Sequence, residues 1–200
     1  MNKTRKIFYL FITMMTIFTL FSCISVPKKT ISLSRNIRAQ GVLSAEELTC
    51  FFIENNIFVN YNDILEMAQY YIDEANAEGI NSDVAFAQMC LETGYLRFGG
   101  LVQPEWHNYC GLGAMDTEHP GEQFATVALG VRAHIQHLQA YSTHEEELLN
   151  QELIDPRYSW VHKTKYVEDI FGLAGTWATD PNYGNKLESL LSRMEAMINN

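Results

Sequence analysis

The sequence predicts a mainly α-helical domain, and three observations favour this fold class. Apolar residues recur every three or four positions in several stretches, as they do on one face of an α-helix. Residues that favour the ends of helices stand at the ends of these stretches. Residues 97–125 are rich in glycine and show no helical period, so we expect a short irregular or β lobe there.

The N-terminal 22 residues have the three parts of a secretory signal. Three positive charges in the first six residues precede an apolar run over residues 7–21. This run is shorter than the roughly 20 residues that span a bilayer. Its end, Leu-Phe-Ser-Cys at 20–23, resembles a bacterial lipobox, in which the cysteine is lipidated. We expect a signal peptide at 1–22 and a lipidated Cys23; an uncleaved anchor helix is the alternative, and either places the protein outside the cytoplasmic membrane.

Residues 23–43 are expected to form a lipid-anchored linker, because they contain a proline, two adjacent lysines, several serines and an asparagine. Residues 44–200 then form one domain, a length that suits a single core. Ser44 and Glu47 have the spacing of a capping box for a helix that ends near Asn55.

Five further helices are expected along the domain. An apolar stripe over residues 64–75 ends before Gly79, and Asn81 or Ser82 can cap the next helix. Other stripes cover residues 127–138 and 187–198, and a further helix is expected over residues 165–177.

The helix after Asn81 carries the residue of greatest chemical interest. Residues 84–91 are apolar except for Gln88, which is typical of a central, buried helix. The segment leads into Glu92, and Gly94 can end the helix. Partial desolvation at such a place raises the pKa of a carboxyl group, as a proton-donating acid requires. An ordinary surface glutamate near a helix end is the alternative.

Charge and composition exclude several functions. The net charge is −10 and no basic stripe is present, so nucleic acid is an unfavourable partner. The six histidines and four cysteines show no familiar metal-ligand spacing, and we expect no metal and no cofactor. Cys90 and Cys110 flank Glu92 and are the pair to test for a disulfide; three buried, reduced thiols are the alternative.

Residues 87–94, Ala-Gln-Met-Cys-Leu-Glu-Thr-Gly, resemble the core motif of bacterial endo-β-N-acetylglucosaminidase domains. These are the peptidoglycan hydrolases of autolysins and flagellar muramidase-like proteins. Segments 108–113, 124–141 and 174–184 are similar to later motifs of the family, in the same order. The resemblance implies a lysozyme-like fold, in which a helical lobe and a short irregular or β lobe lie across a cleft, and identifies 44–200 as the catalytic domain.

The resemblance also implies roles for particular residues. Glu92 matches the general acid of the family, and Tyr183 matches its cleft tyrosine. Asn108, Trp177 and Asp180 match positions that line the cleft or hold its walls; core packing is the alternative for Trp177, and capping of the turn before Pro181 is the alternative for Asp180. Tyr95 is a further aromatic candidate for sugar binding.

The pattern offers two kinds of second catalytic group. An inverting glycosidase uses a second carboxylate to activate water. Glu122 is the preferred candidate among the acids of the irregular lobe, ahead of Asp116 and Glu118. The 2-acetamido group of the substrate is the alternative, with Tyr183 to orient it.

The sequence therefore predicts a glycoside hydrolase that cleaves peptidoglycan strands after N-acetylglucosamine, as a monomer held to the membrane through its N-terminal lipid, on the periplasmic or the outer surface. Two other hypotheses stay open. A lytic transglycosylase uses a single glutamate without water, and a catalytically silent protein would bind the cell wall.

Overall fold

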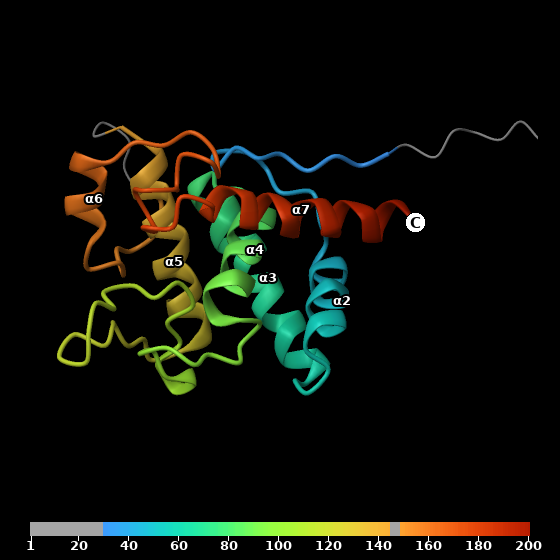
Figure 1. The fold of residues 1–200 in the computed structure, drawn as a ribbon, viewed down its shortest axis with the longest axis horizontal. Coiled ribbons are helices and arrows are strands. Elements are labelled where there is room, and N and C mark those ends of the chain that lie inside the picture. Colours follow the sequence, from blue (N-terminus) through green and yellow to red (C-terminus); the bar gives the residue numbers. More distant parts are fainter. Residues whose placement is uncertain (1–29, 145–148) are drawn as a thin grey trace, which may run out of the picture. The chain divides into compact units, whose positions relative to one another are not determined.

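The computed structural model describes residues 30–144 and 149–200, and residues 31–200 form one compact unit. The expected signal peptide and Cys23 lie outside the described residues. Helices dominate this unit, so the prediction of a mainly α fold is confirmed. None of the described helices is long and apolar enough to cross a membrane. The helices are α2 (Ala45–Asn55), α3 (Tyr61–Glu78), α4 (Ser82–Thr93), α5 (Val127–Ser142), α6 (Tyr158–Thr164) and α7 (Tyr183–Asn199) (Figure 1).

The helix ends follow the predicted capping residues. Ser44 and Glu47 form the capping box of α2, with hydrogen bonds of 3.2 and 2.8 Å between each side chain and the backbone N–H of the other residue. The Asn81 side chain accepts hydrogen bonds from the backbone at the start of α4. Gly94 ends α4 with a φ of +57°, a conformation that costs glycine little.

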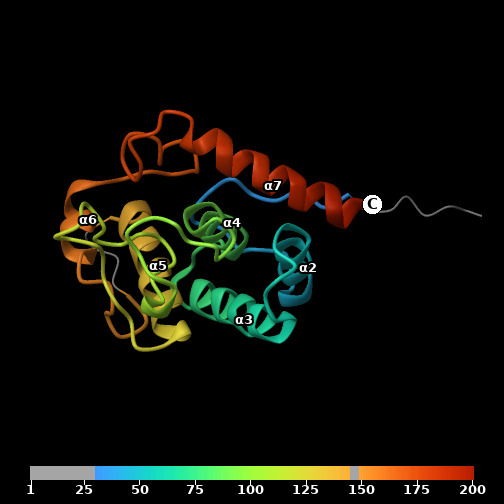
Figure 2. The same cartoon turned by 60° about the horizontal axis from the view of Figure 1, so that its bottom comes forward.

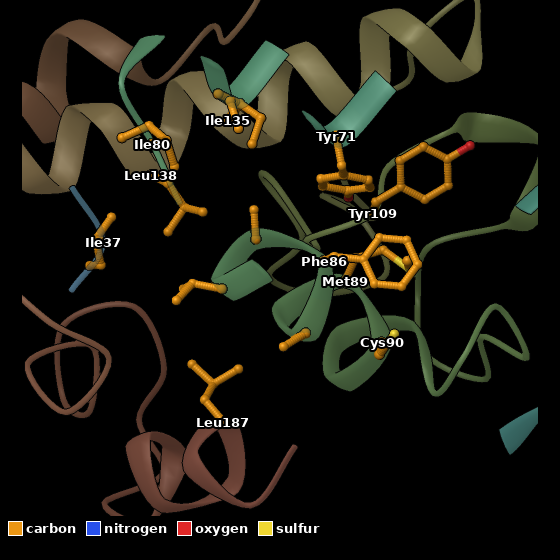
Figure 3. Packing of buried hydrophobic residues seen from close by; sticks show 14 of the residues in the cluster. Ile37, Tyr71, Ile80, Phe86, Met89, Cys90, Tyr109, Ile135, Leu138 and Leu187 are labelled. Atoms are coloured by element: carbon orange, nitrogen blue, oxygen red, sulfur yellow. The ribbon is translucent and has the colours of Figure 1, made fainter. Parts of the chain in front are cut away.

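Helix α4 lies at the centre of the domain and is buried over almost its whole length. It contacts α3, α5, α7 and α2, as the two views of the ribbon show (Figures 1 and 2). In the core, Phe86 and Met89 of α4 lie between side chains of α3 and α5 on one side and Leu187 of α7 on the other (Figure 3). Helix α4 is apolar on nearly all sides because other helices pack against it on nearly all sides.

The prediction of a helix over residues 165–177 is wrong. The structure has α6 at Tyr158–Thr164 instead, and residues 165–177 form turns. The Asp169 side chain accepts hydrogen bonds from the N–H groups of Phe171 (2.9 Å) and Gly172 (3.1 Å), which holds a turn that competes with a helix. The last helix begins at Tyr183, four residues before the stripe at 187–198.

Part of the segment expected to be a linker packs against the helices. Leu33 and Ile37 are buried in the core, with exposed fractions of 3% and 0%. Arg35 forms ion pairs with Glu188 (2.6 Å) and Glu195 (2.5 Å) of α7. Residues 31–43 therefore belong to the folded unit, because their apolar side chains enter its core and Arg35 pairs with α7.

The irregular lobe lies between α4 and α5, as expected. It contains a short 3₁₀ helix, η1 (Pro104–Trp106), and an antiparallel bridge between Ala114 and Pro120. Gly130 of α5 allows this lobe to pack closely, since a Cβ atom there would lie 1.9 Å from the carbonyl oxygen of His107.

Candidate active site

Glu92 lies in the last turn of α4, where the buried helix reaches the irregular lobe. Its side chain lines a hollow of about 190 Å³. The opposite wall comes from the irregular lobe, chiefly Phe98, Leu101, Val102, Asn108, Gly111 and Ala114. Apart from Glu92, the described residues that line this hollow include no acid. The structure therefore places one carboxylate between the two lobes.

The two oxygens of Glu92 have different environments. Oε1 accepts a hydrogen bond from the Tyr183 hydroxyl and another from Trp177 Nε1, at 3.0 Å. Oε2 has no hydrogen-bond partner among the described residues, and the side chain is open to solvent. Packing around the carboxylate raises the pKa of Glu92 by desolvation, and the two donors oppose this shift. One oxygen is fixed and the other is available for proton transfer.

A chain of buried hydrogen bonds leads away from Oε1 into the core. Tyr183 donates to Glu92, so the Tyr183 oxygen accepts from the Gln88 amide nitrogen, at 2.8 Å. The Gln88 amide oxygen then faces His134 Nε2, at 3.1 Å, and can only accept a hydrogen bond from it. In the neutral imidazole the single proton then lies on Nε2, and Nδ1 accepts from the Tyr71 hydroxyl, at 2.9 Å. Every donor points toward Glu92.

This hydrogen-bonded chain, made of Tyr71, His134, Gln88 and Tyr183, connects four helices. Gln88 and Glu92 stand four residues apart and so share one face of α4. Burial lowers the pKa of His134 to about 3, with a smaller effect of the same sign from His137. His134 is therefore neutral at ordinary pH, so that Nε2 donates to Gln88 while Nδ1 accepts from Tyr71.

Trp177 combines the two roles that the sequence left open, a place in the cleft and packing in the core. Its indole nitrogen reaches Glu92, while its ring packs against His137 and Tyr141, with ring centroids 4.9 and 5.2 Å away. His137 is held in turn by Asp155, at 2.7 Å. The ring is thus fixed by the core, and its N–H is aimed at the carboxylate.

Glu122 lies in a neighbouring hollow of about 330 Å³, together with His119 and Arg157, and not among the lining residues of the Glu92 hollow. Its side chain lies beside Gly113. Asp116 is exposed and contacts His119 at 3.1 Å, and Glu118 is exposed as well. The structure therefore does not bring Glu122 into the same hollow as Glu92.

Asn108 and Asp180 both use their polar atoms for contacts within the protein. The Asn108 amide group donates to the carbonyl oxygens of Leu112 (2.9 Å) and Glu122 (3.0 Å) and accepts from the N–H of Leu112 (2.9 Å). The Asp180 carboxylate caps the turn before α7 and pairs with Lys186, at 2.6 Å. Asn108 thus holds the wall that the irregular lobe contributes to the site, whereas the contacts of Asp180 match its alternative role, the capping of the turn before α7.

Tyr95 does not line the Glu92 hollow. Its ring packs against Phe51 and Phe52 of α2, and its hydroxyl accepts from Arg193, at 3.3 Å. The expected sugar contact is therefore not supported, because Gly94 turns the chain so that the residue after it faces α2 and α7.

Cys50, Cys90 and Cys110 are free thiols, so the Cys90–Cys110 disulfide is absent from the described residues. Burial raises the pKa of Cys90 and Cys110, whereas Cys50 is exposed. Among the residues that the structure describes, no group of three or more His, Cys, Asp or Glu side chains is placed to hold a metal ion.

The sequence reasoning missed Gln88 and His134 as parts of the site. A signal for Gln88 was present, since it is the one strongly polar residue in the apolar segment 84–91 and precedes Glu92 by one helical turn. His134 had no such signal, because its partners come from other helices.

Comparison with known proteins agrees with this geometry. The model of the mannosyl-glycoprotein endo-beta-N-acetylglucosaminidase family, Glucosaminidase, matches residues 68–196. The chain belongs to the glucosaminidase family. The matched region contains Glu92, Trp177 and the whole hydrogen-bonded chain, and it supports glycosidase activity on a peptidoglycan-related glycan.

A relative and the solved structures complete the comparison. An uncharacterized protein of Borreliella burgdorferi is 38% identical over 153 residues, which cover 76% of this glucosaminidase and 74% of that protein. No solved structure matches the chain. The relative thus extends the similarity without adding a function, and the family assignment rests on the model match.

Proposed function

We propose that this glucosaminidase hydrolyses β-1,4 glycosidic bonds of peptidoglycan after N-acetylglucosamine, with Glu92 as the general acid. The observation that carries the proposal is the environment of Glu92. Its carboxyl group has a raised pKa, one oxygen fixed by Tyr183 and Trp177, and one oxygen free beside a hollow. These are the properties that a proton donor to a glycosidic oxygen needs.

In the first step, Glu92 carries its proton on Oε2 and gives it to the glycosidic oxygen as the bond from that oxygen to C1 breaks. The carbonyl oxygen of the substrate's own 2-acetamido group forms the new bond to C1. The hollow that contains Glu92 has no other acid among its described lining residues, which supports this substrate-assisted route over a carboxylate from the protein.

In the second step, water attacks C1 and the bond to the acetamido oxygen breaks. The ionised Glu92 takes the proton from that water and so returns to its starting state. Trp177 and Tyr183 keep Oε1 in place while Oε2 loses and regains the proton. The acid and the base are therefore the same residue at different stages.

We further propose that the protein is exported and lipid-anchored to the bacterial cell envelope through Cys23. The signal-like segment 1–22 and the lipobox-like residues 20–23 support this. Such an anchor would bring the catalytic domain to the cell wall. Labelling with a radioactive fatty acid in a bacterial host, compared between the natural chain and Cys23→Ala, tests the anchor directly.

The reaction is tested by incubation of the purified protein with peptidoglycan and mass spectrometry of the products. Reducing N-acetylglucosamine ends are expected, and Glu92→Gln should lower the rate by about 10²- to 10⁴-fold, the usual effect of losing a general acid. Glu118→Gln, an exposed acid of the irregular lobe, is the matched control and should keep its activity. Anhydro-muramic ends would favour a lytic transglycosylase instead, and no soluble product would favour a silent wall-binding protein.

A further inference from the structure

A second hollow, of about 230 Å³, adjoins the site on the side of α6. It shares Gly111 and Ala114 with the hollow that contains Glu92. Trp177, which donates to Glu92, lines it as well. A chain of sugars bound at Glu92 would therefore have a substituent of one ring within reach of this second hollow.

Two cations and one exposed tryptophan give this hollow its chemistry. Arg157 and Lys165 line it, and each places its charge over the ring of Trp160, at 5.7 and 5.8 Å from the centroid. Trp160 is 54% exposed. Neither cation forms an ion pair with a carboxylate within residues 30–144 and 149–200.

Such a cluster is unusual for this protein, whose net charge is −10. Asp155, two residues before Arg157, is buried and engaged with His137, at 2.7 Å. Glu122 lines a further hollow together with Arg157 but forms no ion pair with it in the part of the chain that the structure describes. Two unneutralised cations beside a catalytic hollow attract anions and repel other cations. An arginine fork is also well suited to a carboxylate, which it can bind through two parallel hydrogen bonds.

We propose that Arg157, Lys165 and Trp160 form a subsite for the carboxylate groups of the peptide stem that peptidoglycan carries on alternate sugars. This inference rests on the proposed function. A strand cut after N-acetylglucosamine presents a peptide-bearing sugar next to the broken bond, and the peptide stem carries free carboxylates. The glycan itself is neutral, so the cations distinguish peptidoglycan from other β-1,4 polymers of N-acetylglucosamine.

The test compares kcat/KM on three substrates. Intact peptidoglycan strands carry the stem peptide, strands stripped by an amidase carry only the lactyl carboxylate, and chitin oligosaccharides carry no carboxylate. The variants are Arg157→Gln, Lys165→Gln and the double variant. Lys163→Gln is the matched control, because Lys163 lies on α6, is exposed and does not line the hollow.

The double variant is expected to lower the ratio of kcat/KM on intact strands to that on chitin oligosaccharides by about five- to tenfold, through KM, since each partly exposed pair contributes modestly. Added salt should lower the same ratio in the natural protein and have less effect in the double variant. Lys163→Gln should leave the ratio unchanged.

Three outcomes would overturn the subsite. An unchanged ratio of the two kcat/KM values in the double variant would show that the cations do not bind the peptide stem. The same loss on stripped strands as on intact strands would assign the carboxylate to the sugar and not to the peptide. An equal effect of Lys163→Gln would show that the loss reflects the overall positive charge of this surface and not the cations that line the hollow. Failure of the natural protein to cleave any of the three substrates would instead contradict the proposed function, so the two failures are distinguishable.

Discussion

The two sides of Glu92 are built in opposite ways. On the helical side, Tyr183 and Trp177 hold Oε1, and the hydrogen-bonded chain continues through Gln88 to His134 and Tyr71 in the core. On the side of the irregular lobe, Oε2 meets a hollow with no hydrogen-bond partner among the described residues. One face of the carboxylate is closed and the other is open.

This difference suggests a division of tasks. Buried hydrogen bonds in a low-dielectric core are directional and costly to break, so the helical side fixes the orientation of Glu92 and the direction of its partners' protons. The open side admits the sugar and exchanges the proton. A rigid support and a free reacting atom together satisfy the requirement of a preorganised site.

Tyr183→Phe tests the closed side with the largest expected effect on catalysis after the loss of Glu92 itself. It removes a donor to a charged group, which corresponds to about 10- to 100-fold in rate. Since that donor lowers the pKa of Glu92, its loss should raise this pKa. Glu92 acts while protonated, so the alkaline limb of the profile of kcat/KM against pH should move to higher pH.

Tyr158→Phe is the matched control for this variant. The Tyr158 hydroxyl donates to Gln139 at 2.6 Å in a buried place that does not line the Glu92 hollow. The control should lose a comparable amount of stability, about 1 kcal/mol, and keep both the rate and the pH profile. An alkaline limb that stays in place or moves to lower pH in Tyr183→Phe would contradict the assigned role.

Gln88→Leu tests whether the hydrogen-bonded chain also stabilises the fold. It leaves the Nε2–H of His134 without an acceptor and the oxygen of Tyr183 without its donor in the core, at a cost of about 2–3 kcal/mol. The expected fall in Tm is about 5–10 °C, measured by circular dichroism. Gln69→Leu removes a similar but exposed hydrogen bond on α3, to Asp73, and should change stability by about 0.5 kcal/mol or less. Equal losses in the two variants would contradict the role of the chain.

Most of the fold and part of the site follow from local sequence. Ser44, Asn81 and Gly94 act at helix ends through hydrogen bonds and φ angles of their own segments, so pattern alone locates them. Glu92 was predictable for the same reason, as a carboxylate at the end of an apolar helix. The helix wrongly expected over 165–177 shows the limit, because the Asp169 turn outweighs a weak period.

The rest of the site depends on contacts between distant segments. His134 joins the hydrogen-bonded chain only because α5 and α3 both pack on α4. No local sequence pattern predicts this packing. The same holds for the separation of Glu122 from Glu92, since the path of the irregular lobe is set by the Asn108 amide group and by close packing at Gly130. Side chains from several elements must be placed together before their chemistry is visible.

Glu122→Gln tests the open side, where the smallest effect is expected. If the substrate's acetamido group performs the attack, kcat/KM should change by about twofold or less, because Glu122 is then a partly exposed residue away from the reacting atoms. Asp116→Asn and Glu118→Gln, in the same lobe, serve as controls. A loss for Glu122→Gln alone that approached the loss for Glu92→Gln would instead identify Glu122 as the base of an inverting reaction. The irregular lobe would then have to close on the substrate, because Glu122 now lines the neighbouring hollow with His119 and Arg157.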